Sequence, residues 1–492
     1  MPNSRLSKST FIRGLQCEKS LYLYKHHYNL KDATPLDLQA VFNQGTKIGL
    51  LAQQLFPGGV DASPESYYRM QESVTKTLEY LNQGKQIVYE ATFAYNEVLA
   101  ALDILVKDEE GWKAYEVKSS TKVTDTYIKD AAIQYYTITN SGVNLEDISI
   151  VYINNKYTRE GQLDLQQLFT IESVRDRVLE YLPTIPKELK RLKDTIENDS
   201  VPEKEIGLHC SVPYECDFKG TCWKNIPKYS VFDIAGLHLD KKFNLYSQGI
   251  VTLDQIDLDK SHFNPNQKLQ VRSEVTKTVH IEDDKIKSFT NGLVFPLYFL
   301  DFETCNSAIP YFDNCRPYQQ IVFQYSLHIQ ETTSSVIKHK EFLADHKSDP
   351  RIEFIKRLIE DCGTTGDILV YNIGFERGKL KDLKELFPQY AIKLDNIISR
   401  LKDLMLPFQM KWFYTPEMKG SYSIKAVLPA LVPDLSYQDL EIKEGGAASN
   451  TFLSMVSGTF NGDYKKTRKD LLAYCKLDTF AMVKILERLY NV

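Results

Sequence analysis

YEATFAYNEVLAALDILVKDEEGWKAYEVKSST, residues 89–121, is the stretch that indicates the fold of the first part of this chain. Asp103 follows an alternating and then apolar run, and WKAYEVK has the composition of a second strand. The polar turn 107–111 separates the two runs, so the pattern predicts a hairpin. Glu116 and Lys118 are two residues apart on a strand, and we therefore expect their side chains to share one face.

An acid followed by acid-x-lysine on the next strand is an arrangement that binds a divalent metal beside a phosphodiester. Asp103 and Glu116 would supply hard oxygen ligands to Mg²⁺ or Mn²⁺. Lys118 would orient or deprotonate the attacking water, or neutralise charge in the transition state. Gln134 is expected to join them from a helix over 127–137. The plain alternative is an amphipathic hairpin whose outer face carries an acid and a lysine.

The composition is that of a globular protein, and the 492 residues allow two or three domains. The net charge of -5 does not favour nucleic-acid binding, although a local cleft can be basic on an acidic protein. We find no apolar run near membrane-spanning length and no signal-peptide core at the N-terminus. These observations predict a cytoplasmic protein whose eight cysteines are reduced or metal-bound.

Helical spacing predicts two long helices outside the hairpin region. The first covers residues 7–27 and contains Cys17. The second covers residues 172–198 and carries a basic run. Such a run is more often a solvated face than a nucleic-acid contact.

Three cysteines occur in the loop HCSVPYECDFKGTCW, residues 209–223, namely Cys210, Cys216 and Cys222. This density predicts a metal site, and Cys17 is the obvious fourth ligand. Four thiolates suit an iron–sulfur cluster or a structural zinc ion, and His209 keeps a mixed site open. The bond from Cys17 would close a loop of roughly 190 residues and staple the domain around the hairpin. Free thiols in a surface loop are the alternative.

These motifs, in this order, resemble the RecB-type branch of the PD-(D/E)XK nucleases over residues 5–225. The likeness is greatest to iron–sulfur members such as the CRISPR-associated nuclease and the AddB nuclease domain, which have one cysteine before the nuclease core and three after it. The resemblance implies a metal-dependent DNA nuclease with a mainly structural [4Fe–4S] cluster. Two features depart from the family. No histidine ligand is evident around 45–54, where Glu90 is a candidate substitute, and the cysteine gaps of five residues are wider than usual.

A second group of carboxylates opens with LVFPLYFLDFETCNSAIP, residues 293–310. Asp301 and Glu303 follow a buried strand, where carboxylates are costly unless paired or bound to metal. IVFQYSLHI and VIKHKEFLA come next, and the three runs predict an antiparallel meander. A final helix over 466–490 places Tyr474 and Asp478 four residues apart on one face.

This part resembles the DEDD exonucleases of the RNase H-like fold, tyrosine subclass, over residues 293–492. Asp301-Phe302-Glu303 matches the first motif, NIGFE at 372–376 stands in place of the second, and Tyr474-x-x-x-Asp478 matches the third. The resemblance implies that two metals are held by four acids: Asp301, Glu303, Glu376 and Asp478. It also implies that Tyr474 holds the attacking water near the 3′-terminal phosphate.

Glu376 departs from the family, because the second motif usually carries Asp. Asp403 is expected to act behind the metal ligands. Lys425 could contact the substrate backbone or be an ordinary surface lysine. The remaining cysteines, Cys305, Cys315, Cys362 and Cys475, show no ligand spacing and are expected to be small core or surface residues.

The prediction is an α/β protein with a RecB-like, restriction-endonuclease-like domain at 1–225, a helical connecting module at 226–292 and an RNase H-like domain at 293–492. We expect hydrolysis of DNA ends or single strands in repair, recombination or defence. A binding or assembly subunit with one or both sites silent is the alternative, as is an RNase. The chain lacks a Walker A motif, so unwinding would need a partner such as a helicase or a defence-system protein.

Overall fold

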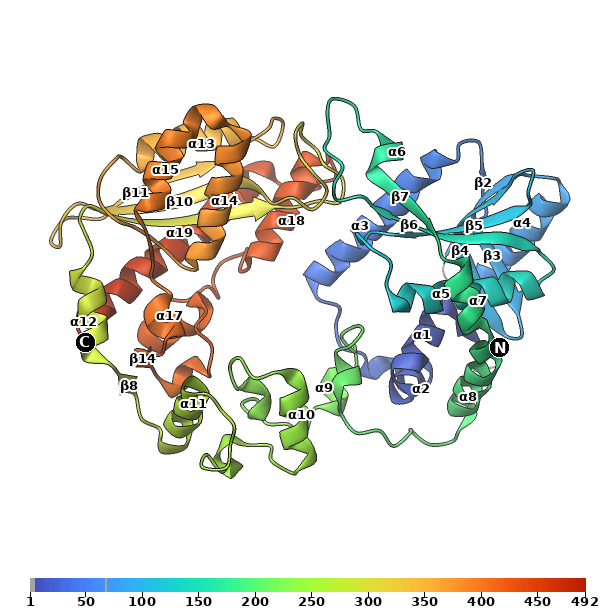
Figure 1. Ribbon diagram of the computed structural model, residues 1–492, viewed down its shortest axis with the longest axis horizontal. Helices are drawn as coiled ribbons and strands as arrows, with labels where there is room; N and C mark the ends of the chain where they lie inside the picture. Colours follow the sequence, from blue (N-terminus) through green and yellow to red (C-terminus); the bar gives the residue numbers. More distant parts are fainter. Residues whose placement is uncertain (1–4, 67–68) are drawn as a thin grey trace. The chain divides into compact units, whose positions relative to one another are not determined.

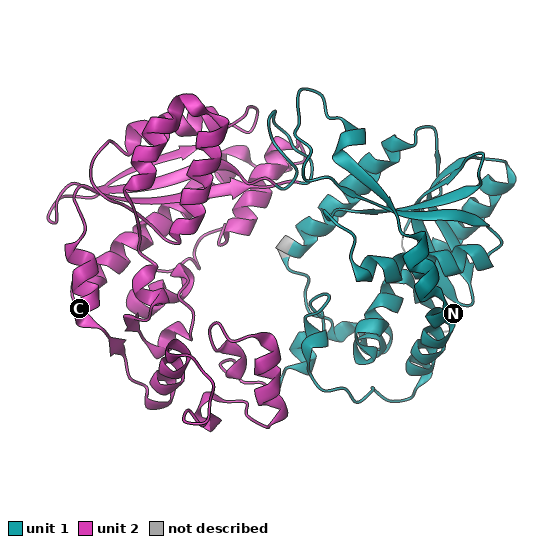
Figure 2. Cartoon of the chain, viewed as in Figure 1, with its two compact units in different colours: residues 1–225, 308–318 teal, residues 226–307, 319–492 magenta. Residues whose placement is uncertain are grey.

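The chain forms two compact units, residues 1–225 with 308–318 and residues 226–307 with 319–492 (Figure 2). The computed structural model describes residues 5–66 and 69–492, except for the side chains of 36 and 37. The first four residues of the predicted 1–225 domain therefore lie outside the described residues. Both units are mixed α/β, and the predicted connecting module 226–292 falls within the second unit. Of the described helices, none has the length and apolar character needed to cross a membrane.

A mixed sheet in the order β2-β3-β4-β5-β6-β7 forms the centre of the first unit, and β1 pairs with β4 (Figure 1). Its strands are β1 Leu6–Ser7, β2 Val60–Asp61, β3 Ile87–Tyr95, β4 Val98–Lys107, β5 Trp112–Lys118, β6 Leu145–Ile153 and β7 Phe169–Ser173. Strands β4 and β5 pair antiparallel, which confirms the predicted hairpin. Strands β5 and β6 are parallel, and the chain between them contains a helix.

The helices of this unit are α1 Lys8–Gln16, α2 Glu18–His26, α3 Leu36–Ala52, α4 Met70–Asn82, α5 Asp125–Asn140, α6 Leu165–Leu168, α7 Arg175–Tyr181, α8 Ile185–Glu197 and α9 Lys219–Cys222. The single predicted helix over 7–27 is wrong, because Cys17 has φ -159° and ψ 114° and separates α1 from α2. The predicted helix over 172–198 is also wrong. Strand β7 occupies its start, and Pro183, which has no N–H to donate, lies between α7 and α8.

Two apolar cores hold the helices of the first unit to its sheet. In one, Phe11 of α1 and Ile133 of α5 pack with Leu102 of β4. In the other, Ile48 of α3 packs with Ile104 of β4. All five side chains are fully buried, and each contributes roughly 1.5–3 kcal/mol by leaving water.

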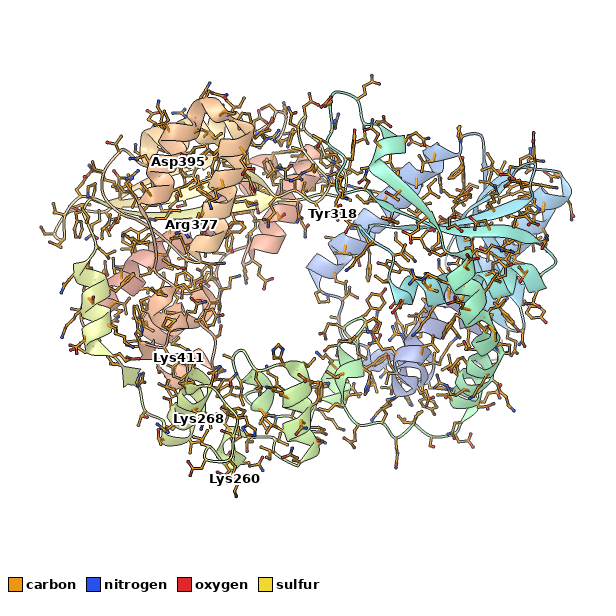
Figure 3. The ribbon with its side chains drawn as sticks, viewed as in Figure 1. Lys260, Lys268, Tyr318, Arg377, Asp395 and Lys411 are labelled. Atoms are coloured by element: carbon orange, nitrogen blue, oxygen red, sulfur yellow. The ribbon has the colours of Figure 1, made fainter. Side chains whose placement is uncertain are left out.

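The segment 308–318 belongs to the first unit although it follows a strand of the second. Its main link is Arg159, whose backbone N–H donates to the carbonyl of Cys315 at 3.0 Å. Ala308 is fully buried in the core that contains α3. Tyr318 donates its hydroxyl to the carbonyl of Ser119, the residue after β5 (Figure 3). The segment is therefore part of the packing of the first unit.

The second unit contains a sheet in the order β11-β10-β9-β12-β13 (Figure 1). The strands are β9 Leu297–Cys305, β10 Ile321–Gln330, β11 Lys338–Leu343, β12 Ile368–Val370 and β13 Leu401–Asp403. Strands β9, β10 and β11 are antiparallel neighbours, which confirms the predicted meander. Strand β12 runs parallel to both β9 and β13. A separate pair joins β8 His280–Ile281 to β14 Phe413–Tyr414.

The helices of the second unit are α10 Leu239–Ser247, α11 Pro265–Thr276, α12 Asp283–Asn291, α13 Arg351–Asp361, α14 Ile373–Leu386, α15 Ala391–Ser399, α16 Leu406–Gln409, α17 Ile424–Leu431, α18 Gly445–Val456 and α19 Tyr464–Leu489. Helix α19 confirms the predicted final helix. Asp463 caps its start by accepting hydrogen bonds from the first backbone N–H groups. Its apolar face packs with β9, as Ile485 and Phe299 show by sharing one core.

Candidate metal centres

The predicted residues of the hairpin meet in the first unit. Lys118 donates from Nζ to Glu116 Oε1 at 2.7 Å, so the two side chains share a face as expected. Lys118 also donates to Asp130 Oδ2 at 2.6 Å. Asp103 of β4 accepts a hydrogen bond from the backbone N–H of Val117 at 2.6 Å. We call Asp103, Glu116, Lys118 and Asp130, with Lys8 and Glu90 described below, the N-terminal acidic centre.

The two predicted carboxylates of this centre differ in their electrostatic environment. Burial, followed by the charge of Glu116, raises the pKa of Asp103 to about 8. Burial also disfavours ionised Glu116, but the charges of Lys118 and Lys8 outweigh it and hold the pKa of Glu116 well below its usual range. Glu116 Oε2 is buried and has no hydrogen-bond partner among the described residues. This oxygen is available to a ligand.

Lys8 and Asp130 also belong to this centre, although the sequence did not predict them as site residues. Lys8, the first residue of α1, donates from Nζ to Glu116 Oε1 at 2.6 Å. Nothing in the local sequence signals this role, because 108 residues separate the pair. Asp130 had a usable signal, since it lies four residues before Gln134 and so on the same face of α5.

Glu90 lies in β3 in a strained conformation. The ladder between β3 and β4 steps from Tyr89–Ile104 to Ala91–Leu102, which leaves Glu90 opposite Asp103. Its φ of 53° is left-handed, and such a backbone costs about 1–3 kcal/mol in a residue other than glycine. Burial raises the pKa of Glu90 to about 7, while the charge of Lys8 opposes the rise. The sequence offered Glu90 as a substitute ligand, and its charge interacts with this centre.

Helix α5 confirms the predicted helix over 127–137, and Gln134 is fully buried in it. Neither its amide nitrogen nor its amide oxygen has a hydrogen-bond partner within the described part of the chain. A buried amide without partners is costly, about 1–3 kcal/mol. The side chain is therefore a candidate for contact with a bound group.

The four predicted cysteines gather in one place, which we call the cysteine group. A small cavity is lined by Cys17, Cys210, Cys216 and Cys222, together with the apolar side chains of Phe218 and Trp223. Burial is the largest cause of the raised pKa of Cys17 and of Cys222, and the neighbouring thiols add to the rise. His209 also lines the cavity. The donor set and the apolar wall fit a thiolate-bound metal or cluster.

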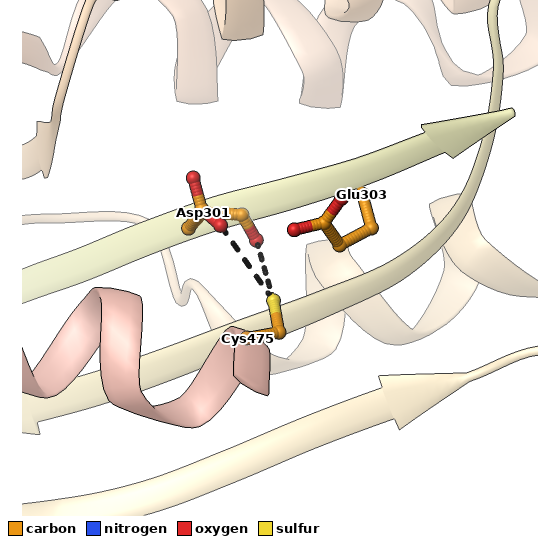
Figure 4. A group of neighbouring side chains, drawn as sticks. All are labelled: Asp301, Glu303 and Cys475. Carbon is orange, nitrogen blue, oxygen red and sulfur yellow. Dashed lines mark hydrogen bonds between the residues drawn. The ribbon is translucent and has the colours of Figure 1, made fainter. Parts of the chain in front are cut away.

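In the second unit, Asp301 and Glu303 of β9 lie beside Cys475 of α19 (Figure 4). A carboxylate oxygen of each acid and the Cys475 sulfur all lie within 4.8 Å of one another. Cys475 Sγ is 3.7 Å from Asp301 Oδ2. Cys475 was expected to be a small core or surface residue, and that prediction is incomplete because its thiol lies among the acids.

The predicted pair on α19 completes this group. Asp478 Oδ1 accepts the hydroxyl proton of Tyr437 at 2.6 Å. Burial raises the pKa of Asp478 to about 6, whereas hydrogen bonds from Tyr437 and Tyr474 and the charge of Lys425 oppose the rise. Lys425 Nζ lies 5.9 Å from the Tyr474 ring centroid. Lys425 therefore faces the acids, and its Nζ also donates to the carbonyl of Lys443 at 2.8 Å.

Glu376 and Asp403 have different roles in the second unit. Glu376 lies in the first turn of α14, is 1% exposed, and has its Oε2 buried without a partner among the described residues. Burial and then the charge of Asp301 raise its pKa well above the usual range. Asp403 instead accepts backbone N–H groups of Asn372 and Ile373. Asp403 thus fixes the start of the helix that carries Glu376.

We call Asp301, Glu303, Glu376, Tyr474, Cys475 and Asp478 the C-terminal acidic centre. Burial is the largest cause of the raised pKa of each of its carboxyls, and mutual repulsion adds to it for Asp301 and Glu303. Buried acids that repel one another require protons or a cation. Fold and sites therefore define a mixed α/β protein with one such centre in each unit.

Part of the chain is similar to known proteins. Residues 298–423 match the family model "Domain of unknown function (DUF2779)". The chain is 25% identical over 306 residues to "Uncharacterized protein UU173" of Ureaplasma parvum, covering 53% of this chain and 41% of that protein. It is 29% identical over 225 residues to "Uncharacterized protein MG366 homolog" of Mycoplasma pneumoniae, covering 41% and 33%. The matches thus span less than half the length of these relatives.

Proposed function

We propose that this protein is a metal-dependent nuclease that hydrolyses phosphodiester bonds of DNA at ends or in single strands. The observation that carries the proposal is the C-terminal acidic centre. Carboxylates from β9, α14 and α19, separated by up to 177 residues of sequence, are buried or half-buried, and their charges interact. Among the described residues, these acids outnumber the cation that faces them, Lys425, and such an excess of negative charge is typical of a site for divalent metals.

The strand order of the second unit supports an RNase H-like domain with DEDDy exonuclease chemistry. An antiparallel meander is extended by two parallel strands, and the first acids lie on the central strand β9. In the first unit, the hairpin with Asp103 and Glu116, followed by α5 and the parallel strand β6, supports a RecB-like PD-(D/E)XK domain. These fold assignments are parts of the proposal.

Bound Mg²⁺ or Mn²⁺ would supply a Lewis acid and lower the pKa of a water molecule. Asp103 and Glu116 would hold the metal in the first unit, and the acids of the C-terminal centre would hold it in the second. Lys118, fixed by Glu116 and Asp130, would place a positive charge beside the scissile phosphate. Tyr474 would orient the attacking water, and Lys425 would attract the substrate backbone.

For the cysteine group we propose a [4Fe–4S] cluster, with zinc as the alternative. Four cysteines around one cavity supply the thiolate ligands that either group takes.

The test is cleavage of end-labelled single- and double-stranded DNA and RNA by anaerobically purified protein with Mg²⁺ or Mn²⁺. Lys118→Ala and Asp301→Ala remove one residue from each centre. Lys113→Ala is the matched control on β5, because Lys113 pairs with Asp108 and Glu110 at the surface. Asp395→Ala, on the exposed side of α15, is the control for the second unit (Figure 3).

Loss of cutting in Lys118→Ala but not Lys113→Ala assigns activity to the N-terminal centre. Loss of stepwise 3′ trimming in Asp301→Ala but not Asp395→Ala assigns activity to the C-terminal centre despite Glu376. If the protein cuts RNA and does not cut DNA, RNA replaces DNA as the proposed substrate. A wild type that binds nucleic acid and cuts none of these substrates would reject the proposal in favour of a binding or assembly subunit.

A further inference from the structure

Lys8 lies at the start of α1 and extends its ammonium group into the N-terminal acidic centre. Its ammonium group contacts Glu116 Oε1 at 2.6 Å, and Lys118 contacts the same oxygen at 2.7 Å. Glu116 would be a metal ligand under the proposed function. One of its two oxygens thus already carries two cations, while Oε2 is buried and unpartnered among the described residues.

The backbone around Lys8 is held firmly. Leu6, 1% exposed, pairs with Val98 in the ladder between β1 and β4. Ser7 and Thr10 form a capping box at the start of α1. Because the ladder and the capping box fix Ser7, the fold sets the position from which the Lys8 side chain extends.

Two of the four carboxyl groups of the centre, those of Glu116 and Asp130, are paired with ammonium groups. Lys8 and Lys118 offset Glu116 and Asp130, to which they are bonded. Burial lowers the pKa of Lys8, but the charges of Glu116, Asp130 and Asp103 outweigh it and raise that pKa to about 12. A divalent cation that binds Glu116 would meet these two ammonium groups at close range, and Coulomb repulsion would oppose its binding.

Lys8 and Lys118 differ in how easily each ammonium group can move away from Glu116. Lys118 is bonded to both Glu116 and Asp130 and projects from the middle of the sheet. Among the described residues, Lys8 has one side-chain bond, to Glu116, and its side chain is 24% exposed. Its long stem can carry the ammonium group into water while α1 stays in place.

We propose that Lys8 is a resident counter-ion of the N-terminal acidic centre, which a divalent metal must displace from Glu116 to bind. The inference rests on the proposed function, because it presumes that Glu116 is a metal ligand. Its consequence is a threshold: the centre stays closed to metal at low concentrations of divalent cations and opens when they are high. Removal of the Lys8 charge lowers that threshold.

The experiment is a titration of the full-length protein with Mn²⁺, with free Mn²⁺ measured by electron paramagnetic resonance. Binding that is lost in Glu116→Gln reports this centre and separates it from other sites. We expect Lys8→Met to tighten the Glu116-dependent dissociation constant by about tenfold or more, since it removes a like charge at contact distance. Lys8→Arg, which keeps the charge, and Lys113→Met, which removes a lysine elsewhere on β5, should stay within about twofold of wild type.

A second measurement needs no substitution. Acetylation of Lys8 by acetic anhydride, followed by mass spectrometry, should increase when Mn²⁺ is added to the wild type, because displacement frees the amine. Unchanged or weaker Mn²⁺ binding in Lys8→Met, or acetylation that does not respond to saturating Mn²⁺, overturns the inference and leaves the proposed function standing. If neither wild type nor Lys8→Met shows Glu116-dependent binding, the metal site of the first unit fails as well.

Discussion

Lys8 begins helix α1 and Cys17 directly follows its last residue, so one nine-residue helix links the N-terminal acidic centre to the cysteine group. Lys8 contacts Glu116 at one end of the helix, and Cys17 lines the thiol cavity at the other. Loss of the metal ion or cluster proposed for the cysteine group is therefore expected to shift α1 and so to alter the N-terminal acidic centre.

The first prediction concerns Cys17→Ser. Removal of one of four thiolates should abolish the visible absorbance of a cluster, lower the melting temperature by several degrees and accelerate amide exchange in α1. Cys222→Ser, which leaves α1 untouched in sequence, should have the same effects. Cys362→Ala, a buried cysteine outside the group, is the control and should keep the absorbance. Full absorbance in Cys17→Ser would remove it from the ligand set.

The second prediction concerns the strained Glu90. Glu90→Gly should raise the free energy of unfolding of the metal-free protein by about 1–2 kcal/mol, because glycine adopts positive φ without a steric cost. The same change should weaken Mn²⁺ binding by removing a carboxylate near Asp103. Denaturant unfolding and Mn²⁺ titration measure the two effects.

Glu97→Gly is the matched control for Glu90→Gly. Glu97 also has positive φ, 59°, but lies in the turn between β3 and β4 and pairs with Lys193. It should leave Mn²⁺ binding unchanged. Equal loss of Mn²⁺ binding in both variants would mean that Glu90 acts through the backbone of the hairpin rather than through its carboxylate.

The third prediction concerns Tyr437→Phe. The Tyr437 hydroxyl holds the pKa of Asp478 down against the effect of burial, so its removal should raise that pKa above about 6. Asp478 must be ionised to bind metal, and the acid limb of the pH–trimming profile should therefore shift to higher pH. Tyr325→Phe, which removes a comparable hydroxyl bond to Asp361 in the same unit, should leave the profile unchanged. An unshifted profile in Tyr437→Phe would exclude Asp478 as the titrating group.

The fourth prediction concerns Lys411, which is 4% exposed and lies 3.9 Å from the Tyr414 ring centroid (Figure 3). Burial lowers its pKa from 10.5 to about 8. Between these pH values the unfolded chain binds more protons than the folded chain, so stability should increase as pH rises from 8 to 10.5. Lys411→Met should abolish this increase and stabilise the protein at pH 7 by up to about 3 kcal/mol.

Lys260→Met is the control for Lys411→Met, because the Lys260 side chain is 87% exposed. Urea unfolding at several pH values measures both variants. The quantity to compare is the free energy of unfolding of the wild type relative to that of Lys411→Met. If it does not increase between pH 8 and 10.5, burial does not lower the pKa of Lys411.

The sequence predicted those parts of the centres that local pattern encodes. Glu116 and Lys118 are two apart on one strand, and Tyr474 and Asp478 are four apart on one helix, so periodicity alone places each pair on one face. The hairpin and the meander followed from the same reasoning and are confirmed. The domain assignments, the nuclease activity and the cofactors remain predictions.

The residues that were missed depend on tertiary contact. Lys8 reaches Glu116 only because β1 docks on β4, and Cys475 meets Asp301 only because α19 packs on β9. The helix over 172–198 was mispredicted for a local reason that could have been seen. Pro183 and Pro186 lie within four residues of each other, and proline favours the start of a new helix over its interior.

The place of the segment 308–318 in the first unit has a consequence for protein synthesis. During translation, Asn225 is synthesised before Ala308 and Tyr318, which help to fill the second core of that unit. At ordinary elongation rates the delay is roughly ten seconds. The first unit therefore cannot finish packing when residue 225 has been synthesised. Its helix α3 and strand β6 stay incompletely covered until residues 308–318, which follow part of the second unit in the sequence, have been made.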